Sequence, residues 1–173
     1  MLKDRITPLV AAPPRTAEAT ALTDEVRQLY DEVADLLDHD EVERFPNYFV
    51  DDCLYQVVSR ENYSEGLPQA AIYCDGIGML RDRVTALRET QVYTPRLWRH
   101  FISGVRVTAV RGGDVHARAN FLLTEAMADH DPTMFLVGQY LDVLVRHEGE
   151  LRFKQRLAVY DNHHVPRSLV LPV

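Results

Sequence analysis

The chain has 173 residues, of which 46% are hydrophobic, and a formal net charge of -7 with a pI near 5.4. This length and hydrophobic content suit one globular domain with a substantial core. The acidic balance argues against a protein that binds the phosphate backbone of nucleic acids, because such proteins gather Lys and Arg on one face. We therefore expect no nucleic-acid partner.

The cysteine content and the first twenty residues bear on the compartment. Cys53 and Cys74 are too few for a disulfide framework and fit no C-x-x-C metal spacing. No window approaches the roughly 20 apolar residues of a membrane span. The first residues carry an early Lys and Arg, as a leader peptide does, but Pro8, Pro13 and Pro14 break the apolar part. We expect a cytoplasmic protein with an extended arm over 1–20 and one domain over 21–173.

Helical periodicity begins at Thr23, a plausible N-cap. One face of this predicted helix is apolar and the other is acidic; the apolar positions are Val26, Leu29, Tyr30, Val33, Leu36 and Leu37. A second helical segment is predicted from Glu41 to about Val50, with Pro46 in its first turn and Asp51 and Asp52 at its end.

Two short strands, 54–59 and 70–74, are predicted next, joined by a loop with the sequence RENYSEGLP. A third helix follows from about Asp75, because Ile77, Leu80, Val84 and Leu87 form one apolar stripe. A short loop containing Tyr93, Pro95 and Trp98 ends that helix.

The rest of the chain predicts a meander of four long strands, 101–110, 115–127, 133–146 and 151–160, with turns at 111–114, 129–132 and 148–150. Alternation assigns one face to each of the last three strands. The predicted sets are Val115, Ala117, Ala119, Phe121 and Leu123; then Phe135, Val137, Leu141, Val143 and Val145; then Leu151, Phe153, Leu157 and Val159, with Arg152, Lys154 and Arg156 opposite.

These elements predict an α+β fold in which a cone-like curved antiparallel sheet packs against about three helices. The chain finishes with the apolar residues Leu169, Val170, Leu171 and Val173. Such a finish either packs back on its own sheet or covers a partner surface, and the sequence leaves both open.

Motifs that carry chemistry are mostly absent: the sequence has no phosphate loop, no nucleophile elbow and no H-E-x-x-H helix. The best single candidate is His100, which opens a strand and could face a cavity with Tyr30, Asp31, Tyr48 or Tyr55 as a general acid or base. The alternative is a hydrogen-bonded structural His, ion-paired through its neighbour Arg99. We favour the structural role, because a catalytic His usually needs a second group to orient it.

Three segments of the sequence resemble a known protein family. The stretch MLRDRVTALRETQVYTPRLWRHFISGVRV, with Asp82 beside Arg83 and Arg99 beside His100, resembles the central signature of the small (beta) subunits of bacterial aromatic-ring-hydroxylating dioxygenases. The ending RLAVYDNHHVPRSLVLPV, with its Asp161-Asn162 pair, is similar to that family's close. The segment Phe45 to Phe49 is similar to its first cone segment. The resemblance covers roughly 25–173.

The resemblance implies a cone similar to nuclear transport factor 2 and scytalone dehydratase, acting as a non-catalytic subunit. It implies an alpha subunit that holds a Rieske [2Fe-2S] cluster and a mononuclear iron, with three alpha on three beta. Independently, neither cysteine lies in the paired Cys and His motifs of a Rieske centre, and no two-His-one-carboxylate set is spaced for iron. The stretch 61–68 resembles the subset that acts on aromatic carboxylates.

Within that resemblance we expect interface or cone-mouth roles for six residues: Asp82, Arg83, Arg99, His100, Asp161 and Asn162. Two alternatives remain open. A stand-alone cone-fold lyase or isomerase would lose turnover when His100 is replaced, and a small-molecule-binding module would hold a ligand without chemistry.

Overall fold

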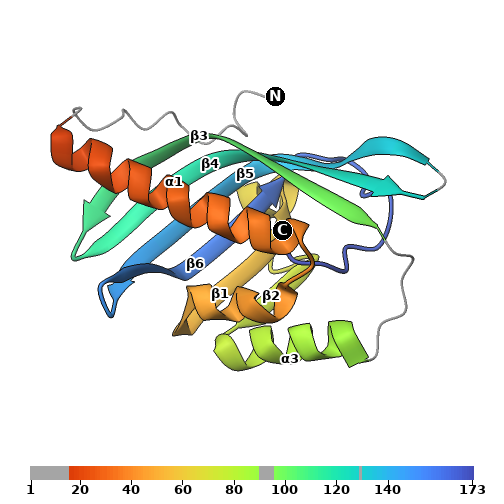
Figure 1. Ribbon diagram of the computed structural model, residues 1–173, viewed down its shortest axis with the longest axis horizontal. Coiled ribbons are helices and arrows are strands. Elements are labelled where there is room, and N and C mark those ends of the chain that lie inside the picture. Colours follow the sequence, from red (N-terminus) through yellow and green to blue (C-terminus); the bar gives the residue numbers. More distant parts are fainter. Residues whose placement is uncertain (1–15, 90–95, 129) are drawn as a thin grey trace.

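The structure is a computed structural model, which describes residues 16–89, 96–128 and 130–173 (Figure 1). Most of the predicted arm, the loop residues Tyr93 and Pro95, and the turn residue Asp129 lie outside these ranges. In chain order the elements are α1 (Ala17–Asp38), η2 (Val42–Tyr48), β1 (Phe49–Ser59), α2 (Arg60–Glu65), β2 (Ile72–Asp75), α3 (Ile77–Glu89), β3 (Leu97–Arg111), β4 (Asp114–Met127), β5 (His130–His147) and β6 (Glu150–Tyr160).

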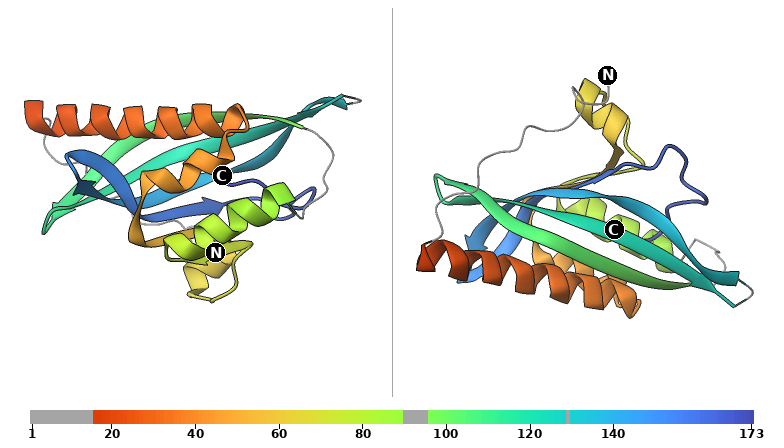
Figure 2. Two further views of the ribbon diagram at one scale, coloured as in Figure 1. Left: turned by 60° about the horizontal axis from the view of Figure 1, so that its bottom comes forward. Right: turned by 90° about the horizontal axis from the view of Figure 1, so that it is seen from above.

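The six strands form one sheet in the order β2-β1-β6-β5-β4-β3. The sheet is strongly curved, α1 lies across its concave side, and α3 lies beside the edge formed by β1 and β2 (Figures 1 and 2). The predicted α+β cone is confirmed. The sheet is mixed rather than purely antiparallel, because β1 runs parallel to β6 while every other pair is antiparallel.

The first helix has the predicted buried face and an earlier start. All six apolar positions predicted on one face are buried. Thr16 is the N-cap, since its side chain accepts a hydrogen bond from the backbone N–H of Ala19 at 3.1 Å. Thr23 lies inside the helix and donates its hydroxyl to the carbonyl of Ala19. Residues 17–20, assigned to the arm from the sequence, are therefore helical.

The region from Glu41 to Glu65 differs most from the prediction. The second helix is a 3-10 helix that ends at Tyr48, and Asp51 and Asp52 lie in β1, at a register irregularity of its pairing with β6. The predicted loop after β1 begins with the helix α2. Ser59 caps α2 by accepting a hydrogen bond from the backbone of Asn62, and Gly66 ends it in the left-handed region at φ 64°.

Two β-bulges change which face of β5 and β6 is buried. Leu123 pairs with Leu136 and Thr124 pairs with Met134, so Phe135 is an extra residue in β5. The buried set continues from Leu136 as Tyr140, Asp142 and Leu144, which corrects the predicted set Val137, Leu141, Val143 and Val145, all half-buried.

In β6 the extra residue is Lys154, because Leu144 pairs with Phe153 and Val143 pairs with Gln155. The alternation therefore inverts after Phe153. Arg156 joins the concave face, and the predicted inward residues Leu157 and Val159 turn to the outer face, where they pack with Val58. The prediction that Arg156 lies on the face opposite Phe153 was wrong.

The core lies between the concave face of the sheet, α1, η2 and α3. Its centre is aromatic, with Tyr55 packed edge-on against Phe45 and Phe49, and with Phe153 against Phe49 and Tyr30. Leu171 and Val173 belong to this core, so the apolar finish of the chain packs back on its own fold. Within the described ranges no helix has the length and apolar character to cross a membrane.

Candidate functional site

The interior of the cone contains a fully buried ion pair. Arg156 of β6 is 1% exposed and its Nη1 lies 3.5 Å from Oδ2 of Asp142 on β5, which is 2% exposed. The other carboxylate oxygen of Asp142 accepts a hydrogen bond from the backbone N–H of Leu157 at 3.2 Å. The guanidinium of Arg156 lies 4.0 Å from the ring centre of Tyr140, and further rings of Tyr30 and Phe153 surround it. A buried guanidinium thus has one carboxylate and three aromatic faces to stabilise it.

Burial dominates the ionisation of this interior. Loss of solvent raises the pKa of Asp142 to about 6, although the positive charge of Arg156 opposes the shift. Burial also raises the pKa of Tyr140 to about 12 and holds the pKa values of Tyr30 and Tyr55 well above the usual range. These tyrosines are therefore neutral at physiological pH.

The last residues of the chain contact the same interior. Tyr55 of β1 accepts a hydrogen bond from the backbone N–H of Val173 at 2.8 Å and donates its hydroxyl to the Val173 backbone oxygen at 3.4 Å. The same oxygen lies 3.5 Å from Nε of Arg156. On α3, Arg83 donates to the carbonyls of Leu169 and Val170, at 3.4 and 3.1 Å.

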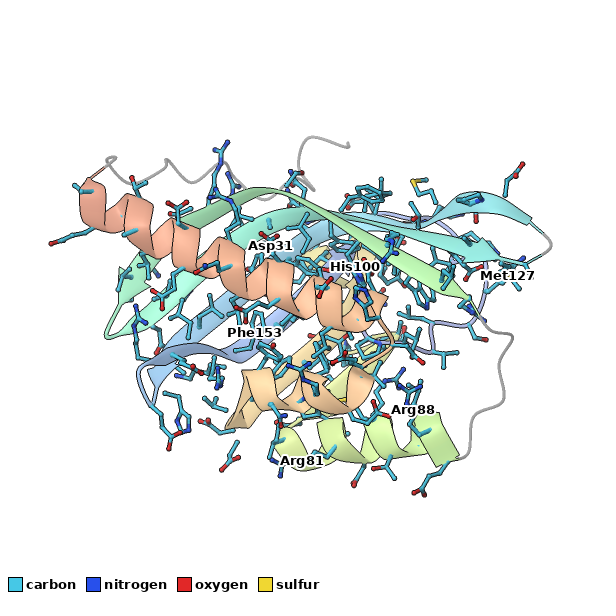
Figure 3. The ribbon with its side chains drawn as sticks, in the orientation of Figure 1. Asp31, Arg81, Arg88, His100, Met127 and Phe153 are labelled. Carbon is cyan, nitrogen blue, oxygen red and sulfur yellow. The ribbon has the colours of Figure 1, made fainter. Side chains whose placement is uncertain are left out.

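His100 has a carboxylate partner that the sequence reading missed. Its Nδ1 lies 2.7 Å from Oδ1 of Asp38, the last residue of α1, and its backbone N–H donates to both oxygens of that carboxylate at 3.1 Å. The His100 side chain is only 2% exposed, whereas the neighbouring Arg99 is 59% exposed and lies 3.7 Å from Asp38. Figure 3 shows His100 under the last turns of α1. Asp38 thus orients the imidazole and ties α1 to β3.

The Asp161-Asn162 pair directly follows β6, the last strand of the sheet. Asn162 accepts a hydrogen bond from the backbone N–H of Val137 at 2.9 Å and donates to the carbonyl of Phe135 at 3.1 Å. Asp161 accepts a hydrogen bond from Nε of Arg60 on α2 at 2.8 Å. Both residues thus act within the fold, where Asn162 continues the hydrogen bonding of β5 beyond the end of β6.

The six predicted site residues do not form one cluster. Arg83 and the exposed Asp82 lie on α3 beside the β2 edge of the sheet, while Arg99 and His100 lie on β3 at the opposite edge (Figure 1). Asp161 and Asn162 lie at a third place, beyond β6. The structure instead brings together Asp142 and Arg156. Alternation placed both residues opposite the predicted inward set, and the bulges at Phe135 and Lys154 turn Asp142 and Arg156 inward.

Metal-binding chemistry has little support among the described residues. No three His, Cys, Asp or Glu residues there are grouped so that they could hold a metal ion. Cys53 and Cys74 are buried and free, and burial raises the pKa of both thiols, that of Cys53 to about 11. Such thiols are protonated at neutral pH and are poor ligands or nucleophiles.

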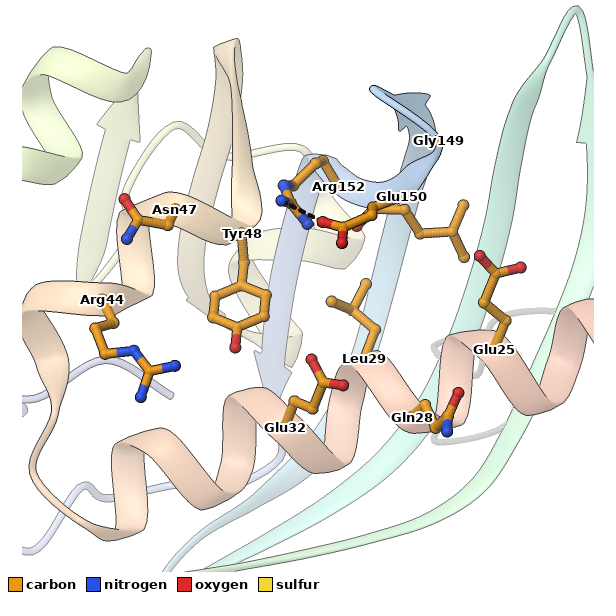
Figure 4. Close-up of a pocket in the computed structure, with 11 residues that line it drawn as sticks. Glu25, Gln28, Leu29, Glu32, Arg44, Asn47, Tyr48, Gly149, Glu150 and Arg152 are labelled. Carbon is orange, nitrogen blue, oxygen red and sulfur yellow. Dashed lines mark hydrogen bonds and ion pairs between the residues drawn. The ribbon is translucent and has the colours of Figure 1, made fainter.

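The surface has a polar pocket of about 400 Å³ between α1, η2 and the turn before β6 (Figure 4). Most of its charged residues already have partners: Glu25 pairs with Arg146, Glu150 pairs with Arg152, and Arg44 pairs with Glu41. His100 does not line this pocket. The pocket therefore contains neither the imidazole nor a free cluster of charges that would suggest chemistry.

The curved sheet around α1 defines a class of cone-shaped α+β proteins. A crystal structure from Novosphingobium aromaticivorans DSM 12444, provisionally assigned as a scytalone dehydratase, matches with a TM-score of 0.65 over 91% of this chain and 97% of that one. The sequence identity is 18%, so this likeness shows the fold alone.

The family follows from closer matches. The profile described as "Ring hydroxylating beta subunit" matches residues 32–167, and the chain belongs to that family. The anthranilate 1,2-dioxygenase small subunit of Burkholderia cepacia is 34% identical over 137 residues, which cover 79% of this chain and 85% of the relative. A second crystal structure from N. aromaticivorans, provisionally assigned as the beta subunit of an aromatic-ring-hydroxylating dioxygenase, is 35% identical with a TM-score of 0.82, over 90% of this chain and 99% of that one.

Proposed function

We propose that the chain is the non-catalytic beta subunit of a multicomponent oxygenase that hydroxylates an aromatic ring, and that the substrate is an aromatic carboxylate. Membership in the ring-hydroxylating beta-subunit family supports the role. The substrate class rests on the relative from B. cepacia, whose name assigns it to an anthranilate dioxygenase. Anthranilate is itself an aromatic carboxylate.

The observation that best supports the non-catalytic role is that side chains fill the interior of the cone. Rings, the Arg156–Asp142 pair and the residues Leu171 and Val173 fill the space between the concave face and the helices. His100 has an orienting carboxylate but its imidazole is almost fully buried, away from the pocket described above. Neither the buried His100–Asp38 pair nor the exposed His39–Asp35 pair lines that pocket, so the pocket gives no support to acid–base chemistry.

The proposal includes the partner and its cofactors. We infer an alpha subunit that carries a Rieske [2Fe-2S] cluster and a mononuclear iron, and an assembly of three alpha with three beta subunits in the cytoplasm. In such an assembly this chain would act as a platform that fixes the positions of neighbouring alpha subunits. Electron transfer from a cluster to an iron in the next subunit depends on that positioning.

Among the six predicted site residues, Asp82 and Arg99 fit the interface role best. Both are exposed, whereas Arg83, His100 and Asn162 make their hydrogen bonds within the fold. Arg99 lies on the outer face of β3 between Leu97 and Phe101, which are 69% and 57% exposed. Large apolar side chains exposed beside a cation support contact with another protein.

Co-expression with a candidate alpha subunit tests the proposal. A tag on this chain should recover a larger chain in stoichiometric amount, and the complex should contain iron and acid-labile sulfide that this chain purified alone lacks. If the two chains never associate and this chain alone turns over a substrate, the subunit role is wrong.

A further inference from the structure

The chain after β6 turns back into the cone and ends among its most buried residues. In the left view of Figure 2 the C label lies between α1 and α3. Leu171 is 6% exposed and Val173 is fully buried. By contrast His163 and His164, with which the segment leaves the sheet, are exposed. The segment thus passes from solvent into the core within about ten residues.

Side chains from three separate elements hold the backbone of this segment. Tyr55 of β1 uses its hydroxyl both as acceptor for the N–H of Val173 and as donor to its oxygen. Arg156 of β6 approaches the same oxygen, and Arg83 of α3 donates to two successive carbonyls, those of Leu169 and Val170. Each of these contacts recognises main-chain atoms, as a binding site for an extended peptide does.

The side chains of the segment supply the apolar part of the recognition. Leu171 and Val173 join the main hydrophobic cluster, and Leu169 and Val170 pack against it. Pro172 between the two buried residues is also buried. Proline restricts the extended backbone before binding, which lowers the entropy lost when the segment docks. Main-chain hydrogen bonds and buried apolar side chains are the two components by which proteins recognise extended peptides.

We propose that the cone interior is a binding site for an extended apolar peptide segment, and that residues 169–173 of this chain occupy it in cis. The ligand class is a short apolar peptide whose backbone lies against Tyr55, Arg83 and Arg156. The site holds α3 to β1 and β6 through its ligand, and it excludes small molecules from the interior while the segment is bound. This inference does not depend on the proposed subunit role.

Amide hydrogen exchange on the full chain is the first test. The N–H of Val173 should exchange at least about 100-fold more slowly than in an unstructured peptide. Tyr55→Phe removes the acceptor of that N–H and should accelerate its exchange about tenfold, the effect of one neutral hydrogen bond. Tyr63→Phe on the exposed side of α2 is the matched control and should change nothing at Val173. Exchange of the wild-type Val173 amide at the rate of an unstructured peptide overturns the proposal.

Cleavage of the folded full chain is the second test, through a protease site inserted between His163 and His164. The cleaved fragment should stay bound, and a labelled synthetic peptide of residues 164–173 should displace it with saturation. The same peptide with Val173→Asp should fail to displace it. If cleavage unfolds the chain, refolding on addition of the unmodified peptide supports the site, and failure to refold counts against it. Release of the fragment from a chain that keeps its full stability also overturns the proposal.

Discussion

Replacing Asp142 with Asn tests the buried ion pair through the pH dependence of stability. Asp142 is 2% exposed, and its carboxylate contacts Arg156 at 3.5 Å and the backbone N–H of Leu157 at 3.2 Å. The amide of Asn keeps the size and one acceptor oxygen but has no ionisation. The difference between the wild type and Asp142→Asn therefore isolates the titration of this one carboxyl group.

The direction in which stability changes with pH follows from the direction in which the pKa of Asp142 is shifted. Burial raises the pKa of Asp142 from 3.8 in the unfolded chain to about 6 in the folded protein. Between these values the folded state binds more protons, so the contribution of Asp142 to the free energy of unfolding is fully present below pH 3.8 and falls as the pH rises through 6. The whole shift corresponds to about 3 kcal/mol. Between pH 4.5 and 7.5 the expected loss is about 2 kcal/mol.

Urea unfolding at intervals between pH 4.5 and 7.5 measures this change for both proteins. The free energy of unfolding of the wild type minus that of Asp142→Asn should decrease by about 2 kcal/mol across the range. Glu148→Gln, which removes a carboxyl group from the exposed turn before β6, is the matched control. A constant or rising difference for Asp142→Asn would show that burial does not raise the pKa of this carboxyl group.

Three further predictions concern assembly, sheet termination and strand packing. Arg99→Ala should weaken association with the alpha subunit in a pull-down. The free energy of unfolding should change by less than about 1 kcal/mol, because exposed ion pairs contribute little to stability. Arg27→Ala on α1 is the control, and unchanged association of Arg99→Ala would contradict an interface role. Asn162→Ala leaves two backbone groups of β5 without partners and should lower the free energy of unfolding, measured with urea, by about 1 to 3 kcal/mol. Asn162→Asp keeps the acceptor and should lower it less. Equal losses for the two variants would count against the role of Asn162 as a hydrogen-bond partner of β5. Gly138→Ala places a methyl group 2.1 Å from a backbone oxygen of β6 and should lower the free energy of unfolding by more than about 3 kcal/mol. The control is Gly78→Ala on α3, where the added methyl group meets nothing within 4 Å and should leave stability unchanged or slightly raised. Equal effects of the two substitutions would contradict the close packing of Gly138 against β6.

Periodicity predicted the elements whose faces differ clearly in polarity. The stripe of α1, the stripe of α3 and the inward face of β4 were all confirmed, because each alternates between apolar and charged positions. In β5 both faces are apolar, so period 2 could not choose between them. The bulge at Phe135 then decided the outcome, and its extra residue leaves no mark in composition.

The buried ion pair shows why the interior of the cone escaped prediction. Arg156 follows Arg152 and Lys154 at the same period, so alternation placed all three on the face opposite Leu151 and Phe153. The bulge at Lys154 inverts the strand after Phe153 and carries Arg156 into the core. Asp38 was not predicted as the partner of His100 for another reason. It lies 62 residues before His100, and only the curvature of the sheet brings β3 to the end of α1. A usable signal existed for α2, since Ser59 and Gly66 are a typical N-cap and C-terminal glycine.

Native mass spectrometry of the complex recovered through this chain tests the proposed subunit role. We expect one species that contains three copies of this chain and three copies of a larger chain, with all bound iron assigned to the larger chain after dissociation. The role of a non-catalytic beta subunit is wrong if this chain is recovered alone in the presence of a folded, iron-loaded candidate alpha subunit, or if iron stays bound to this chain after dissociation.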